Sequence, residues 1–278
     1  MDGKMTDHAR SLPLPVVSLG RIALPAAAEG TRDLPAEVPV AMVYDGSTQA
    51  VMMATPADIE DFAWGFALTE GILTHRAQVE EQEVFVHDQG IEARFWLSED
   101  RGQALVARRR AMAGPVGCGL CGIDSLSEAI RPLPQVTADL HLSIEEVLEA
   151  TDRLNAGQVL HGRTRATHAA GFLRPGQGID LVREDVGRHN ALDKLIGALW
   201  RQDVPASSGA MVMTSRVSVE LVQKCALAGC PVLIAVSAPT ALAVDLADRS
   251  GITLIAQARG GRAEIFTHPH RVLGRDCV

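Results

Sequence analysis

The chain has 278 residues, of which 47% are hydrophobic and 22% charged, so it can form one large or two small globular domains with apolar cores. Its formal net charge of -8 argues against a broad nucleic-acid-binding surface, although a local basic pocket for phosphate is compatible with it. No apolar run reaches the roughly 18–20 residues that span a bilayer, and the first residues lack the apolar core of a signal peptide, so we expect a cytoplasmic protein without membrane contact.

The amino-terminal half begins with an arm and continues as a smaller, strand-rich domain. Residues 1–35 hold four prolines, and we expect a mobile or loosely packed arm there. Residues 36–135 contain a helix expected from Pro56 to about Leu73. Four segments have strand patterns and pair as two hairpins: Val38–Tyr44 with Gln49–Ala54, and Glu83–His87 with Ile91–Leu97.

A glycine-rich loop at residues 114–122 carries Cys118 and Cys121, each flanked by glycine on one or both sides. A thiolate is the reactive form of cysteine, and the small neighbours leave both sulfurs accessible. A Cys-x-x-Cys pair in a reducing compartment is typical of redox chemistry, metal binding or sulfur transfer. Cys118 can accept a sulfane sulfur as a persulfide, with Cys121 placed to assist or resolve it.

The other cysteines give little support to a zinc site. A second ligand pair would have to be Cys225 and Cys230, whose x4 spacing and apolar surroundings indicate buried core residues. Cys277, close to the end of the chain, we interpret as incidental. A zinc deaminase is also disfavoured, because position 170 is alanine where a His-x-Glu signature would place glutamate. We therefore expect no metal.

The carboxy-terminal half, residues 136–278, alternates strands with helices and predicts an α/β domain with parallel strands. Ser143 is expected to cap a helix, because an acidic first turn follows it. A hairpin turning at residues 174–178 comes next. Further elements are expected as helices at about 190–201, 217–228 and 240–249, and as strands at 210–214, 232–237 and 252–256.

Polar and basic residues follow the strands of this domain, where ligands bind in open α/β sheets. Three of the strand ends run into helix starts, which attract anions, and arginine supplies paired donors for phosphate. Polar helix caps alone would give part of this pattern, but four such ends with five arginines favour a site for a phosphorylated or nucleotide ligand. The expected binding residues outside the last strand end are Arg188, His189, Asn190, Ser215, Arg216 and Ser237.

Several charged residues allow more than one interpretation. Asp185, His189 and Asp193 can be a catalytic acid–base set, but a histidine beside a helix start more often orients a ligand. His168 is compatible with either a site or a core residue. The run Arg108–Arg110 is either a solvated surface or a docking element beside the cysteine loop.

The motifs together resemble the formate dehydrogenase accessory sulfurtransferase family (FdhD), over roughly residues 30–270. The resemblance rests on the cysteine loop at 117–122, on Arg183–Lys194, and on three segments in matching order: Thr214–Glu220, Ser237–Thr240 and Thr267–Pro269. It implies a sulfur carrier that takes sulfur from a cysteine desulfurase. It further implies transfer to the bis-molybdopterin guanine dinucleotide molybdenum cofactor, which is then inserted into formate dehydrogenase.

The resemblance also assigns roles and a fold. Cys118 carries the persulfide with Cys121 as its partner, the carboxy-terminal domain is cytidine-deaminase-like without the zinc site, and the protein is a homodimer. The cofactor segment near the last strand consists of Gln257, Ala258, Arg259, Gly260, Gly261 and Arg262. The family commonly has an aromatic residue after this strand, where Gln257 and Ala258 stand here. The alternative is a nucleotide-binding regulatory or scaffold protein whose cysteines bind metal or are incidental.

Overall fold

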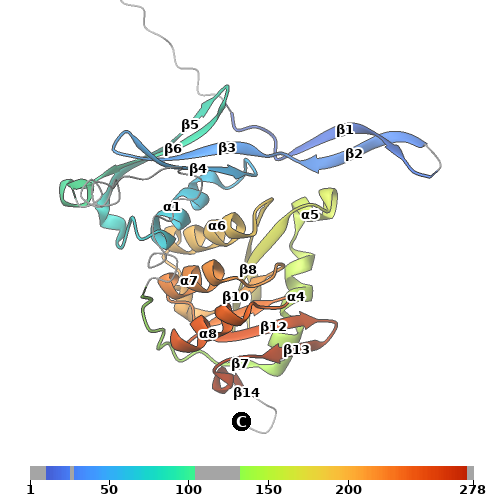
Figure 1. Ribbon diagram of the computed structural model, residues 1–278, viewed down its shortest axis with the longest axis vertical. Coiled ribbons are helices and arrows are strands. Elements are labelled where there is room, and N and C mark those ends of the chain that lie inside the picture. Colours follow the sequence, from blue (N-terminus) through green and yellow to red (C-terminus); the bar gives the residue numbers. More distant parts are fainter. Residues whose placement is uncertain (1–10, 26–27, 104–131, 274–278) are drawn as a thin grey trace, which may run out of the picture.

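The computed structural model describes residues 11–25, 28–103 and 132–273. Two β-sheets lie at opposite ends of the body, with helices α1 and α6 back to back between them (Figure 1). A two-stranded hairpin projects from the side of the amino-terminal sheet (Figure 1). The expected α/β carboxy-terminal unit with a smaller strand-rich amino-terminal unit is confirmed, while the boundary near residue 135 stays a prediction.

The amino-terminal sheet has four strands in the order β4-β3-β6-β5. Both predicted hairpins are present, and β3 pairs in parallel with β6 to join them. Alternate residues such as Met42 and Phe95 are fully buried against α1, as the two-residue period of a strand requires. The bounds are β3 Val38–Tyr44, β4 Ser47–Ala54, α1 Ile59–Thr69, η1 Arg76–Gln78, β5 Val79–His87 and β6 Gly90–Leu97.

Residues 16–35, assigned from the sequence to a mobile or loosely packed arm, hold a regular antiparallel hairpin of β1 (Val16–Ala23) and β2 (Ala28–Pro35). Its prolines lie before β1, between the strands and at the last position of β2, where they leave the strand pairing intact. Asp33 ties the hairpin to the carboxy-terminal unit through an ion pair with Arg163 at 2.8 Å.

The carboxy-terminal sheet has six strands in the order β13-β12-β11-β10-β8-β9. Helix α4 covers one face, and α6, α7 and α8 cover the other, so two apolar layers sandwich the sheet. Strands β10, β11 and β12 are parallel, as the alternation of strands with helices predicted. The bounds are α4 Ile144–Ala156, β8 His168–Arg174, β9 Gly178–Asp185, α6 Arg188–Arg201, β10 Ala210–Met213, α7 Val219–Ala228, β11 Val232–Ala235, α8 Ala241–Arg249, β12 Thr253–Arg259 and β13 Arg262–Ile265.

Short elements complete the described chain. They are β7 Leu142–Ser143, α5 Val159–Thr164, η2 Ala206–Ser208, η3 Pro269–Arg271 and β14 Val272–Leu273. The predicted cap of α4 is confirmed: the Glu146 amide donates to Ser143 Oγ (3.2 Å), and the Ser143 amide donates to Glu146 Oε2 (2.8 Å).

The two units meet at a close crossing of α1 and α6 with a glycine on each helix. A Cβ at Gly65 would lie 1.8 Å from the carbonyl oxygen of Asp193, and a Cβ at Gly197 would lie 1.8 Å from that of Asp61. Only residues without a side chain allow this backbone contact. The crossing holds the amino-terminal unit against the helix that begins at the carboxy-terminal sheet edge.

Candidate functional site

Four strands of the carboxy-terminal sheet end at one edge. Strands β10, β11 and β12 are parallel, and β9 runs the same way because β8 is antiparallel to both β9 and β10. We call the segments at and just beyond these strand ends, 186–190, 214–218, 236–240 and 257–262, the strand-end rim. The start of β8 lies at the same edge. The predicted gathering of the four strand ends is confirmed, whereas ligand binding there stays a prediction.

Adjacent loops of the strand-end rim contact one another. The Gln257 amide donates to the carbonyl oxygen of Ser237 (3.4 Å), and Val217 forms an isolated bridge with Pro239. His189 Nε2 lies 3.5 Å from Ser218 Oγ, so α6 is joined to the loop before α7. The rim is therefore a continuous border and not four separate loops.

Helices α6, α7 and α8 begin at this border, as predicted. The N-cap residues are Gly187, Ser218 and Thr240, and neither Asn190 nor Ser215 is one of them. Thr240 Oγ1 accepts the amide of Ala243 at 3.2 Å. Gly187 has no side chain with which to cap α6, so the first amides of that helix are left for another acceptor.

The last strand end forms a tight turn between β12 and β13. Gly260 and Gly261 have φ values of 59° and 70°, the left-handed conformation that a two-residue hairpin requires, and Arg259 pairs with Arg262 across it. Gln257 is also left-handed, at φ 52°, where the β12–β13 register shifts. These residues border a depression of about 730 Å³, which Leu148 and Glu264 also line.

Ala258 is the exception within this segment. Its side chain is fully buried in the core under α4, and its carbonyl oxygen accepts Thr151 Oγ1 at 2.7 Å. Because Ala258 faces inward, its side chain is not available for the expected cofactor contact at this position.

The opposite end of the rim combines a guanidinium with two imidazoles. His168 opens β8 and pairs with Asp185, and α6 begins three residues after Asp185 with Arg188 and His189. Burial and then the charge of Arg188 lower the pKa of His168, and the same two causes lower the pKa of His189 to about 4. Both imidazoles are therefore neutral at physiological pH.

Two predicted binding residues are bonded mainly within the protein. Asn190 is 4% exposed, and its amide nitrogen donates to the Met53 carbonyl oxygen (2.8 Å) and to Asp185 Oδ1 (3.0 Å). Ser215 is also 4% exposed, and its hydroxyl donates to the Arg216 carbonyl oxygen at 3.0 Å. These residues support the shape of the rim, whereas Arg216 itself is exposed.

The carboxylates considered as catalytic acids are buried in ion pairs beneath the rim. Asp185 Oδ2 lies 2.7 Å from Lys194 Nζ, and both side chains are fully buried. Asp193 Oδ2 lies 2.9 Å from Lys224 Nζ. The Thr55 amide also donates to Asp185 Oδ2 (2.9 Å), which ties the amino-terminal unit to the rim. This burial and pairing exclude the catalytic set Asp185–His189–Asp193 as a solvent-facing group.

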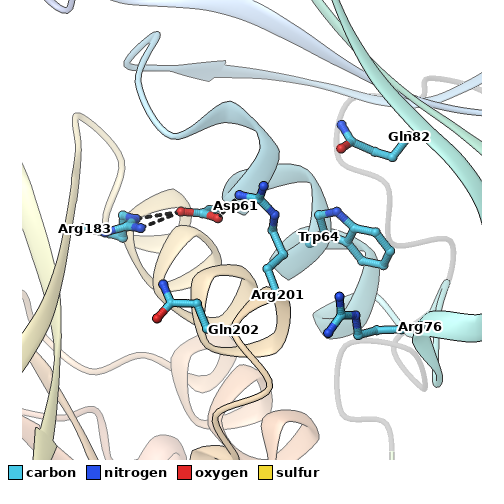
Figure 2. Close-up of a pocket in the computed structure, with 7 residues that line it drawn as sticks. All are labelled: Asp61, Trp64, Arg76, Gln82, Arg183, Arg201 and Gln202. Atoms are coloured by element: carbon cyan, nitrogen blue, oxygen red, sulfur yellow. Dashed lines mark hydrogen bonds and ion pairs between the residues drawn. The ribbon is translucent and has the colours of Figure 1, made fainter.

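Arg183, one of the five arginines counted near the strand ends, does not face the rim. Its guanidinium lies 2.7 Å from Asp61 Oδ2, and Arg201 contacts the other oxygen of this carboxylate at 2.6 Å. Figure 2 shows these residues in a second depression at the α1–α6 junction, with Trp64 and Arg76 on its far side. It encloses about 430 Å³, and each of its arginines has a carboxylate partner. Because its arginines are already paired with carboxylates, this depression is less suited to binding an anion than the strand-end rim is.

The predicted reactive cysteines, Cys118 and Cys121, lie outside the described residues, as do Cys277 and the arginine run 108–110. Cys225 and Cys230 are fully buried, as expected, and burial raises the pKa of Cys230 to about 11. Within the described ranges, no group of three or more histidine, cysteine or acidic side chains could hold a metal ion.

The rim is long compared with a single phosphate. Strand β9 is four strand positions from β12 in the sheet order, which corresponds to about 19 Å at about 4.8 Å per strand. Arg188 follows β9 at one end, Arg216 follows β10 midway along the rim, and Arg259 and Arg262 flank the turn after β12 at the other end. Such spacing suits an extended ligand with more than one anionic group.

Comparisons with known proteins agree with the motifs. The sequence profile of the FdhD/NarQ family matches residues 35–273. The chain is 52% identical over 264 residues to the sulfur carrier protein FdhD of Agrobacterium fabrum, covering 92% of this chain and 97% of that one. It is 46% identical over 236 residues to the sulfur carrier protein FdhD of Bordetella petrii, covering 85% of each.

A solved structure shares the fold. The crystal structure of a candidate formate dehydrogenase accessory protein from Desulfotalea psychrophila superposes with a TM-score of 0.74 at 25% sequence identity, covering 94% of this chain and 100% of that chain. In the described part of the present chain, none of the helices is long and apolar enough to cross a bilayer.

Proposed function

The chain belongs to the FdhD/NarQ family, and we propose that it is a sulfur carrier that supports formate dehydrogenase. Relatives at 52% and 46% identity, matched over most of their length, are named sulfur carrier protein FdhD. The glycine-flanked Cys118 and Cys121 supply the thiols that such a role needs.

Sulfur loading is a thiol–persulfide exchange with a cysteine desulfurase. The Cys118 thiolate attacks the terminal sulfur of the desulfurase persulfide, a new S–S bond forms on Cys118, and the desulfurase cysteine leaves as a thiolate. For delivery, the Cys121 thiolate attacks Cys118 Sγ, a Cys118–Cys121 disulfide forms, and hydrosulfide leaves. Cys121 supplies the electron pair for this step, and a dithiol reductant then restores both thiols.

The recipient of the hydrosulfide is the bis-molybdopterin guanine dinucleotide molybdenum cofactor, bound as a substrate along the strand-end rim. The observation that carries this assignment is the continuous border of about 19 Å with arginines towards both ends. Guanidinium groups and uncapped helix amides suit the phosphates of a dinucleotide. The sulfurated cofactor then passes to formate dehydrogenase.

Guanine-nucleotide binding tests this assignment. Arg188→Ala and Arg259→Ala, at opposite ends of the rim, should each weaken binding of diguanosine diphosphate in calorimetry by about ten- to a hundredfold, since a charged hydrogen bond contributes about 1.5–3 kcal/mol. Arg249→Ala is the matched control, because Arg249 lies at the end of α8 farthest from the rim. Wild-type affinity in both rim variants would mean that the ligand binds elsewhere.

Persulfide formation separates the carrier from the alternative, a nucleotide-binding regulatory or scaffold protein with metal-binding or incidental cysteines. After incubation with a desulfurase and cysteine, the intact protein should gain the mass of a sulfur atom. The double variant Cys118→Ser/Cys121→Ser should not. A stoichiometric zinc content without a sulfur adduct would favour the alternative.

We also propose that the protein is a homodimer, formed through the apolar outer side of the amino-terminal unit. Val51 and Met53 of β4 are 59% and 49% exposed, and on β1 Val17 and Leu19 are 45% and 52% exposed. The opposite side of this unit packs on α1 and, through Asp33, on α5. The outer surface of the sheet and hairpin is roughly 700 Å², close to the about 800 Å² per partner of a specific interface.

Light scattering tests the dimer. Leu19→Asp should shift the mass towards a monomer, whereas Thr31→Asp adds the same charge on the other side of the hairpin and should leave the dimer intact. A monomeric wild type would exclude this interface.

The proposed thiol chemistry requires a compartment that keeps cysteines reduced, so we place the protein in the cytoplasm. We propose no nucleic-acid or membrane partner.

A further inference from the structure

The start of α6 brings a guanidinium and two imidazoles from different elements into one place. Strand register puts His168 beside Asp185, and the chain reaches Arg188 and His189 three and four residues after Asp185. All three side chains are partly buried at the rim and partly open to solvent. The juxtaposition of these three groups depends on the β8–β9 pairing and cannot come from the helix alone.

Among the described residues, no side chain accepts a hydrogen bond from the first amides of α6. The N-cap of this helix is Gly187, and no acidic residue occurs in its first turn. In the described part of the chain, Arg188 Nε is buried without a hydrogen-bond partner. A buried donor of this kind is costly unless a ligand oxygen satisfies it.

The charges around the imidazoles explain why they are neutral and what would change this. His189 is influenced by Arg188, Glu220, Lys224 and His168, and burial is the largest cause of its lowered pKa. His168 is influenced by Arg188, His161 and Asp185, and burial is again the largest cause of its lowered pKa. A doubly negative group placed between the imidazoles would oppose the charge of Arg188 and raise the pKa of both histidines.

We propose that Arg188, His168 and His189 form a pyrophosphate subsite at the start of α6 and that binding of the anion is accompanied by proton uptake on the imidazoles. Phosphate suits this cluster better than a carboxylate because it can accept from the guanidinium fork, the helix amides and both imidazoles at once. As a protonated imidazole donates from both nitrogens, each proton taken up adds a charge-assisted contact. The identification of the pyrophosphate with that of a guanine dinucleotide rests on the function proposed above.

Calorimetry with diguanosine diphosphate tests the subsite, because the pyrophosphate diester of this probe keeps its charge between pH 5 and pH 8. Measurements in two buffers of different ionisation enthalpy give the number of protons taken up. The wild type should bind more tightly at pH 5.5 than at pH 7.5, by up to about tenfold per pH unit for each proton gained. His168→Gln and His189→Gln should each reduce the uptake and flatten the pH dependence.

Arg188 serves as the charge control. Arg188→Gln should weaken binding at both pH values, by about tenfold or more, while Arg188→Lys should retain part of the affinity. Equal affinity at the two pH values without proton uptake, or wild-type uptake in both histidine variants, would overturn the proposal, as would absence of binding by the wild type. Sulfur loading of the wild type, read by intact mass, is measured in parallel, so failure of the carrier role would be seen separately from failure of the subsite.

Discussion

Replacement of Gly197 at the α1–α6 crossing should lower the free energy of unfolding, by an amount that can be worked out from the structure. In Gly197→Ala the new Cβ would lie 1.8 Å from the carbonyl oxygen of Asp61, whereas ordinary contact begins at 3.4 Å. The helices must therefore separate by about 1.6 Å, or the backbone must distort by a similar amount, because neither atom belongs to a flexible side chain. Movement of α1 would also strain the ion pairs that Asp61 makes with Arg183 and Arg201.

Overpacking of this kind typically costs about 1–3 kcal/mol, and a backbone contact belongs to the upper part of that range. The intrinsic helix propensity of alanine offsets about 1 kcal/mol. We expect a net loss of about 2 kcal/mol in the free energy of unfolding, measured by urea denaturation, which corresponds to a Tm lower by roughly 4–8 °C.

Gly162→Ala is the matched control, because Gly162 is also helical and its Cβ would meet no atom within 4 Å. It should leave the urea midpoint unchanged or raise it slightly. If Gly197→Ala unfolds at the same urea concentration as the wild type, the helices do not make the close crossing described here.

Three further sites test interactions within the carboxy-terminal unit. Lys194→Met leaves the carboxylate of Asp185 buried without its cation and should lower the free energy of unfolding in urea by about 3–5 kcal/mol. Recovery of stability in the double variant Asp185→Asn/Lys194→Met would attribute the loss to the unpaired charge. An unchanged urea midpoint in Lys194→Met would contradict the burial of this ion pair. The pKa of His189 falls from 6.5 to about 4 on folding, so the unfolded chain binds this proton at a higher pH than the folded chain. The free energy of unfolding should therefore decline as the pH falls from 6.5 towards 4. The same decline in His189→Gln would show that other groups cause it. Ser143→Ala removes the acceptor of the Glu146 amide and should lower stability by about 0.5–2 kcal/mol in the same assay, while no loss would mean that water replaces the cap.

The local part of the fold could be predicted because its signals are local. The alternation of strand and helix patterns identified β10, β11 and β12, and a serine followed by an acidic first turn marked the start of α4. The common edge of the strand ends followed from parallel pairing alone. The prediction for β12 stopped at residue 256 because the register shift at Gln257, beyond which the strand continues to Arg259, depends on pairing with β13.

The roles of individual rim residues depend on contacts between distant segments. Asn190 was expected to bind a ligand, but its amide nitrogen donates to Met53, 137 residues earlier in the chain. Arg183 similarly contacts Asp61, 122 residues away. Spacing within a motif cannot reveal such partners. His168 remained ambiguous for the same reason, since only the β8–β9 register places it beside Asp185.

The assignment of the thiols still rests on the sequence and the family, because the loop that contains them lies outside the described residues. What the structure adds is the rim to which sulfur could be delivered. The Cys-x-x-Cys spacing was compatible with redox, metal and sulfur chemistry, and the family membership favours the last of these.

Site-resolved sulfur loading tests the central claim most directly. Each single cysteine-to-serine variant is incubated with a cysteine desulfurase and cysteine, and the intact mass is measured under non-reducing conditions. Our account predicts an added sulfur atom in the wild type, in Cys121→Ser and in the control Cys277→Ser, and none in Cys118→Ser. Undiminished loading of Cys118→Ser would contradict it.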